Sequence, residues 1–234
     1  MTTHVTRTVL LAVAACAAGP VFAQVPPPPP PAPPPAYGAT AATVAAGRIR
    51  QFLINPNGDV DGLLLADGTQ VNFPPHLSQA LLQIARVGDA VSVQGVRGYG
   101  AEASAHATSI TNTGNGRSMV DQPPAPGVAP PAPSALTPLS VNARISRVLY
   151  AEQGDVNGAI LDDGMIVRFP PHIGVQLHNL LRSNPQLAAS GYGTENAYGR
   201  ALEATSLSID GQPPIIIYGP GQPPGAPPPA PGPR

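Results

Sequence analysis

Hydrophobic and polar positions follow the same succession of patterns twice along the chain. In the first copy, residues 41–54 form a β-rich run that ends at the turn sequence Asn-Pro-Asn-Gly. Residues 59–66 form a second apolar run, which ends at Asp67-Gly68, a dipeptide that suits a tight hairpin turn. Val71 and Phe73 then alternate with polar residues, as in a half-buried strand. These patterns predict three strands before residue 74.

The period then changes from that of a strand to that of a helix. One apolar stripe at helical spacing consists of Leu77, Ala80, Leu81, Ile84 and Ala85. Residues 89–96 and 104–111 alternate again and predict two further strands. The first copy therefore has the predicted order β-β-β-α-β-β.

The second copy repeats this order at a constant offset of 96 residues. Residues 47–95 and 143–191 agree at 18 of 49 positions, including the turn glycines and the sequence Phe-Pro-Pro-His. Agreement of this length and regularity indicates an internal duplication, and so predicts two domains of the same fold.

The repeated Phe-Pro-Pro-His begins at Phe73 and at Phe169. A proline disfavours the helical conformation in the residue before it, and it suits the first position of a helix. We interpret the motif as a strand-to-helix corner with the aromatic ring in the core. A weaker alternative makes His76 and His172 metal ligands or catalytic bases. Neither copy places a second histidine, a cysteine or a carboxylate at helical spacing from them, so we predict no metal site, no catalytic residue and no cofactor.

Five short strands with one helix between the third and the fourth resemble the oligonucleotide/oligosaccharide-binding (OB) fold. The resemblance covers both copies and implies an all-β class with one helix per copy: two tandem, closed five-stranded barrels. It also implies ligand binding across strands 2 and 3 and between the loops that join strands 1–2 and 4–5.

Proline divides the chain. The sequence has 33 prolines, most of them in three tracts that predict extended spacers with little core. The expected organisation is a proline-rich segment at 24–41, an OB-like domain at 42–115, a linker at 116–139, a second OB-like domain at 140–211 and a proline-rich tail at 212–234. With few apolar positions in the linker, we expect the two domains to fold independently.

Residues 1–23 have the pattern of a secretory signal peptide. A weakly basic start precedes a short apolar run, and Val21 and Ala23 suit cleavage before Gln24. An alternative is lipoprotein processing, with a lipid anchor on Cys16, the single cysteine. No other stretch reaches the roughly 20 apolar residues that span a bilayer. We expect a periplasmic or secreted protein.

Charge disfavours nucleic acid as a partner. All 12 basic residues are arginine, and acidic residues number 13, which leaves a formal net charge of −1. Binding along a phosphate backbone needs several cationic contacts. The expected partner is a glycan or a protein of the cell envelope.

The predicted binding residues lie in two glycine-rich runs that follow the fourth strand of each copy: Arg97, Tyr99, Tyr192, Tyr198 and Arg200. Exposed tyrosine beside arginine can stack on a sugar or a base and hydrogen-bond its edge. We predict a non-enzymatic binding or adaptor module of the cell envelope. The alternatives are a metal-dependent hydrolase that uses the two Pro-Pro-His histidines, and a purely structural envelope spacer.

Overall fold

A computed structural model of the chain describes residues 42–98, 104–123, 135–181 and 183–218. The predicted signal peptide, Cys16 and Tyr99 lie outside these ranges. Both copies belong to one compact unit. The first copy contains β1 (Thr43–Ile54), β2 (Val60–Leu65), β3 (Gln70–Asn72), the 3₁₀ turn η1 (Pro75–Leu77), α1 (Ser78–Ile84), β4 (Ala90–Arg97), β5 (Ser104–Asn112) and β6 (Ser118–Val120). The second contains β7 (Thr137–Tyr150), β8 (Val156–Leu161), β9 (Ile166–Arg168), α2 (Pro171–Leu181), β10 (Gln186–Asn196), β11 (Gly199–Ile209) and β12 (Ile215–Ile216).

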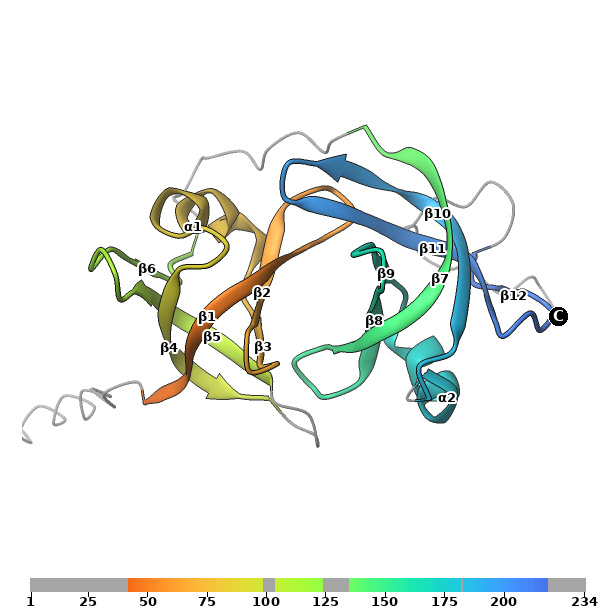
Figure 1. Ribbon diagram of the computed structural model, residues 1–234, viewed down its shortest axis with the longest axis horizontal. Coiled ribbons are helices and arrows are strands. Elements are labelled where there is room, and N and C mark those ends of the chain that lie inside the picture. The colour runs from red at the N-terminus through yellow and green to blue at the C-terminus, as the bar shows by residue number, and fades with distance from the viewer. Residues whose placement is uncertain (1–41, 99–103, 124–134, 182, 219–234) are drawn as a thin grey trace, which may run out of the picture. The chain divides into compact units, whose positions relative to one another are not determined.

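Each copy closes into a five-stranded barrel (Figure 1). In barrel 1, β1 pairs with both β2 and β4, and the parallel pairing of β3 with β5 completes the ring. Barrel 2 repeats the arrangement, with β9 parallel to β11. The helix lies between the third and fourth strands in both copies. The predicted fold is therefore confirmed: the chain carries two tandem barrels of the OB type.

The barrel cores contain apolar residues of the predicted strands. Leu53, Leu63 and Val71 are fully buried in barrel 1. Phe73 and Phe169 are also buried, at the corner where each third strand passes into its helix. In barrel 1 the proline pair opens a 3₁₀ turn before α1, whereas in barrel 2 it leads directly into α2.

A sixth short strand extends each copy. β6 pairs with β5, and β12 pairs with the equivalent strand β11. Both lie in segments that the sequence analysis assigned to the linker and the tail. Each includes apolar residues: Met119 of β6 is buried, and β12 consists of two isoleucines.

The glycine-rich run of the second copy is a strand and not a loop, which corrects the sequence-based placement of Tyr192 and Arg200. β10 and β11 pair continuously as far as Asn196 and Gly199. Gly191 and Gly193 are required there because an added Cβ would stand 1.9 Å from a carbonyl oxygen of β11 at either position. The run is therefore rich in glycine because two strands approach closely, not because the chain turns.

The two barrels contact each other through equivalent faces. Gln51 donates from Nε2 to the carbonyl oxygen of Gly164 at 3.4 Å, and Arg147 donates from Nη2 to the carbonyl oxygen of Gly68. Each pair of equivalent residues, 51 with 147 and 68 with 164, is separated by the repeat offset of 96. Reciprocal contacts of this kind define a two-fold, isologous interface, here formed within one chain.

Apolar and buried polar groups fill the same interface. Ile160 and Ile166 of barrel 2 belong to a hydrophobic cluster whose other members come mainly from barrel 1. Gln70 is 1% exposed and bonds both backbone groups of Tyr150, accepting from its N–H at 3.0 Å and donating to its oxygen at 2.8 Å. Buried apolar and polar contacts therefore join the two domains directly, in addition to the linker.

Candidate functional site

The face that OB barrels commonly use for ligands is covered in both copies. That face runs across the second and third strands. In barrel 1 it carries Leu64 and Gln70, and in barrel 2 it carries Ile160 and Ile166; all four are buried. Each barrel covers this part of the other's face, so a ligand can reach only the margin of the face that stays open.

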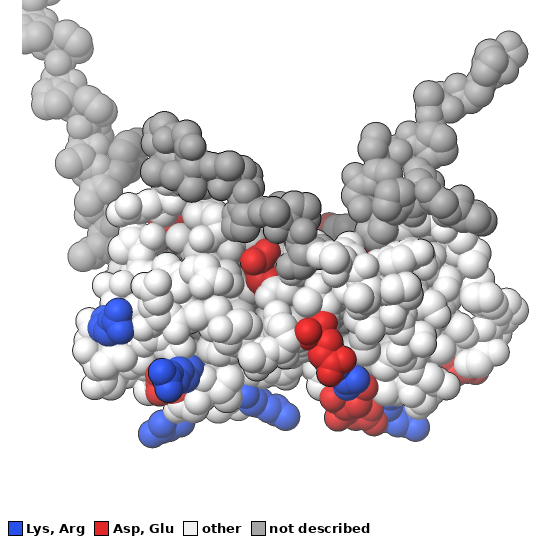
Figure 2. Space-filling model, turned by 90° about the horizontal axis from the view of Figure 1, so that it is seen from above, with Lys and Arg blue, Asp and Glu red and all other residues white. Residues whose placement is uncertain are grey.

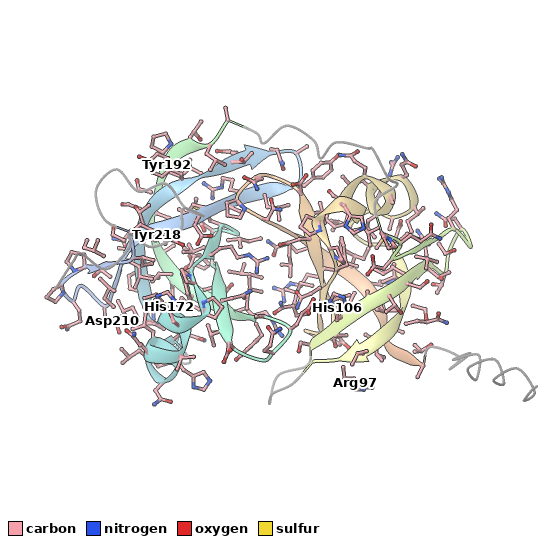
Figure 3. The ribbon with its side chains drawn as sticks, turned by 180° about the vertical axis from the view of Figure 1, so that it is seen from behind. Arg97, His106, His172, Tyr192, Asp210 and Tyr218 are labelled. Atoms are coloured by element: carbon pink, nitrogen blue, oxygen red, sulfur yellow. The ribbon has the colours of Figure 1, made fainter. Side chains whose placement is uncertain are left out.

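The predicted tyrosines and arginines do not form one cluster. Arg97 ends β4 in barrel 1, whereas Tyr192 lies on β10 in barrel 2, and Figure 3 shows them far apart. Arg200 is held by Asp163, with Nη2 and Oδ2 2.9 Å apart. Tyr198 packs edge-on against Phe52 of barrel 1, with ring centroids 6.1 Å apart. Of the described candidates, Tyr192 keeps an exposed ring without such a contact.

The two Pro-Pro-His histidines lie on different barrels and have different surroundings. His76 Nε2 is 3.0 Å from the carbonyl oxygen of Gln122 and 3.6 Å from Asp121 Oδ1. His172 lies in the first turn of α2. Within the described ranges no group of three histidine, cysteine, aspartate or glutamate side chains is placed to hold a metal ion.

A cleft of about 380 Å³ opens where the two barrels meet, and we call it the inter-barrel cleft. Barrel 1 contributes its β1–β2 turn and the start of β2, while barrel 2 contributes β8, β9, β11 and the segment after β12. The polar residues that line it are Asn55, Asp61, Asn157, Arg168, Glu203 and Tyr218. Convergent polar groups in a cleft between two domains are the usual setting of a ligand site.

Hydrogen bonds hold the charged groups of the cleft in place. Arg168 Nη2 donates to Asp61 Oδ1 at 3.1 Å, which links the two barrels. Tyr218 donates its hydroxyl to Glu203 Oε1 at 3.3 Å. Within the described part of the chain, two lining atoms are buried without a hydrogen-bond partner: Asn157 Oδ1 and Arg168 Nε. Buried polar atoms are normally paired, so this acceptor and this donor remain available to a ligand or to water.

Burial perturbs the acids of the cleft. It raises the pKa of Asp61 above its usual value, and the nearby Arg168 guanidinium opposes that shift. Burial also raises the pKa of Glu203, against the hydrogen bond from Tyr218. The pKa of the Tyr218 phenol is raised by burial and by the neighbouring Glu203 carboxylate. Perturbed groups that meet in a cleft mark a functional-site candidate.

No local pattern in the sequence predicts this site. Its residues come from five separate segments, and Tyr218 lies in a segment that was assigned to the tail. One signal was present: Leu63-Leu64-Leu65 and Ile166-Val167 are continuous apolar runs, as expected of strands that are buried on both faces. These runs predict a covering partner for each barrel but do not identify it.

Charged groups are sparse on the face drawn in Figure 2, and both signs occur there. No helix among the described residues has both the length and the apolar character needed to cross a membrane.

No protein-family model matches the sequence, and no curated protein matches it. Among solved structures, the chain is similar to a deletion mutant of the single-stranded DNA binding protein from Thermus aquaticus. The sequences are 14% identical, and the match covers 76% of this chain and 95% of that chain with a TM-score of 0.24. The assignment of the OB fold therefore rests on the strand pairings of the two barrels.

Proposed function

We propose that this protein is an exported, non-enzymatic binding or adaptor module of the cell envelope, with a glycan or a protein as its partner. The signal-peptide pattern at the N-terminus supports export. The proline-rich segments around the barrels support a binding unit that is flanked by extended spacers. The barrels supply a rigid body, and the binding groups lie on its remaining surfaces.

The observation that carries the proposal is the inter-barrel cleft. It is built from both copies, it contains perturbed acids, and it holds two buried polar atoms without partners. Carboxylate, amide and phenol groups together match the hydroxyl groups of a sugar or the polar groups of a peptide. A secondary surface surrounds Tyr192, which pairs across the sheet with Pro138 and Glu203.

Nucleic acid fits the cleft poorly. Two carboxyl groups, Asp61 and Glu203, stand against one guanidinium, which is already bound to Asp61. A phosphate backbone needs the opposite balance of charge. On the strand face where OB proteins stack bases, Leu64 and Gln70 of barrel 1 and Ile160 and Ile166 of barrel 2 are also buried.

Capture from an envelope extract tests this proposal. The mature chain is immobilised, and the extract is used untreated, after protease digestion and after periodate oxidation of its sugars. Retention that only the protease abolishes identifies a protein partner, and retention that only periodate abolishes identifies a glycan. A labelled single-stranded oligonucleotide is titrated in parallel by fluorescence anisotropy. Tight, salt-sensitive binding of the oligonucleotide, with no retention from the extract, would overturn the proposal.

A further inference from the structure

Some buried polar atoms of the inter-barrel cleft have no hydrogen-bond partner among the described residues. Arg168 is 9% exposed, and its Nη2 is bound to Asp61 while its Nε has no partner. Asn157 Oδ1 is likewise buried and unpaired. Among the described residues, Tyr218 is the one that donates to Glu203, and a carboxylate can accept several hydrogen bonds. Among the described cleft residues, the buried atoms without a partner are therefore one acceptor, Asn157 Oδ1, and one donor, Arg168 Nε.

The charges in the cleft favour a cationic ligand. Its ionisable side chains are the two carboxyl groups of Asp61 and Glu203, the Arg168 guanidinium and the Tyr218 phenol. Arg168 forms an ion pair with Asp61, and its charge reaches Glu203 only from farther away. Among the described residues, Glu203 therefore has no cationic partner at hydrogen-bond distance. An added cation would favour its ionised form, because an opposite charge nearby stabilises a buried carboxylate. The chain has no lysine, so no side chain of its own can supply an ammonium group.

We propose that the inter-barrel cleft binds a small ligand that carries a primary ammonium group beside a hydroxyl, the arrangement of an amino sugar. The ammonium donates to the Glu203 carboxylate and to Asn157 Oδ1, since it has three donors and no acceptor. The hydroxyl accepts from Arg168 Nε. This inference rests on the proposed binding function and narrows it to one class of ligand.

Three sugars of one ring type form a matched set of probes. Glucosamine carries the ammonium, N-acetylglucosamine replaces it with a neutral amide, and glucose replaces it with a hydroxyl. Each is titrated by calorimetry into the full mature chain near neutral pH, where most of the amine is protonated and Glu203 is more fully ionised than in acid. We expect glucosamine to bind at least about tenfold more tightly than the two neutral sugars, a difference that a single charge-assisted contact can produce.

Substitutions in the inter-barrel cleft test whether glucosamine binds there. Glu203→Gln removes the charge but keeps an acceptor for Tyr218, and Asn157→Leu removes an acceptor that makes no internal bond. Each should weaken glucosamine binding by about tenfold or more. Glu195→Gln, which changes an exposed glutamate of β10 outside the cleft, is the matched control and should leave binding unchanged. Thermal unfolding of each variant shows that a loss of binding does not come from a loss of fold.

Equal binding of all three sugars would overturn the inference, as would no binding of any, or glucosamine binding that survives both cleft substitutions. Retention of an envelope partner without any glucosamine binding would leave the proposed binding function in place and overturn the inference alone. The absence of both an envelope partner and glucosamine binding would overturn both.

Discussion

Tyr192 and Tyr198 expose almost the same fraction of their surface, 42% and 41%, but their surroundings differ. The Tyr198 ring packs on Phe52 across the barrel interface, whereas the structure gives Tyr192 no such ring contact. We expect Tyr198→Ala to lower the free energy of unfolding by about 1 kcal/mol, the typical value of an edge-to-face aromatic pair. Tyr192→Ala should hardly change it and should instead weaken retention of the envelope partner. Thermal melting and the capture assay measure the two effects. Equal melting temperatures for the two variants would contradict the assignment of Tyr198 to packing.

We expect the buried Glu203 carboxyl group to make the free energy of unfolding depend on pH. Its pKa in the folded protein is raised by burial above the ordinary value of 4.5. Below that value the carboxyl is protonated in both states. As pH rises towards the higher folded pKa, the unfolded chain releases the proton first, so the contribution of this group to stability falls.

Replacing Glu203 with glutamine removes this penalty while Tyr218 keeps an acceptor. We expect Glu203→Gln to stabilise the protein by about 1 kcal/mol near neutral pH and to have little effect near pH 4. Denaturant unfolding of both proteins between about pH 4 and pH 8 measures the difference. A stability difference that does not change with pH would contradict a buried, titrating carboxyl group.

At the scale of elements, the close approach of β10 and β11 depends on glycine. An alanine Cβ at Gly193 would lie 1.9 Å from the carbonyl oxygen of Ala201, so the strands would have to separate. We expect Gly193→Ala to cost about 3 kcal/mol or more in thermal or denaturant unfolding, because the obstacle is backbone and not a flexible side chain.

Gly47→Ala is the matched control on β1. Its added Cβ would meet Leu65 at an ordinary 3.7 Å, and the equivalent residue of the second copy, Ala143, is already alanine. This substitution should be neutral or slightly stabilising. If the two alanine variants were equally stable, the strand assignment of the glycine-rich run would be wrong.

At the scale of the molecule, the interface predicts that the two barrels unfold together. Ile160 is 3% exposed and packs in a cluster with residues of barrel 1. Ile160→Glu buries a charge at that surface without changing the core of barrel 2. We expect a single calorimetric transition for the native sequence, and a split or a marked downward shift of that transition for this variant.

Val175→Glu is the control for this experiment. Val175 is 61% exposed on α2, so the substitution should leave the transition almost unchanged. Two separate transitions in the native protein, both insensitive to Ile160→Glu, would restore the expectation of independent domains that the proline-rich linker suggested.

The sequence by itself determined the elements and their repetition. Asp67-Gly68, the Phe-Pro-Pro corner and the change of apolar period after Phe73 act through local backbone preferences, and the structure has strands and helices in that order. The same local rules misplaced Tyr192, because glycine serves both turns and close strand contacts. Whether a glycine lies in a turn or in a close strand contact depends on the position of the neighbouring strand.

Only the tertiary structure decided how the two copies meet and therefore where a ligand can bind. Asp61 and Arg168 are 107 residues apart, and no local pattern specifies their contact at 3.1 Å. The continuous apolar run at Leu63–Leu65 indicated a second buried face but not its partner. That pairing depends on the combined shape and polarity of two folded surfaces, which exist only once both barrels have formed.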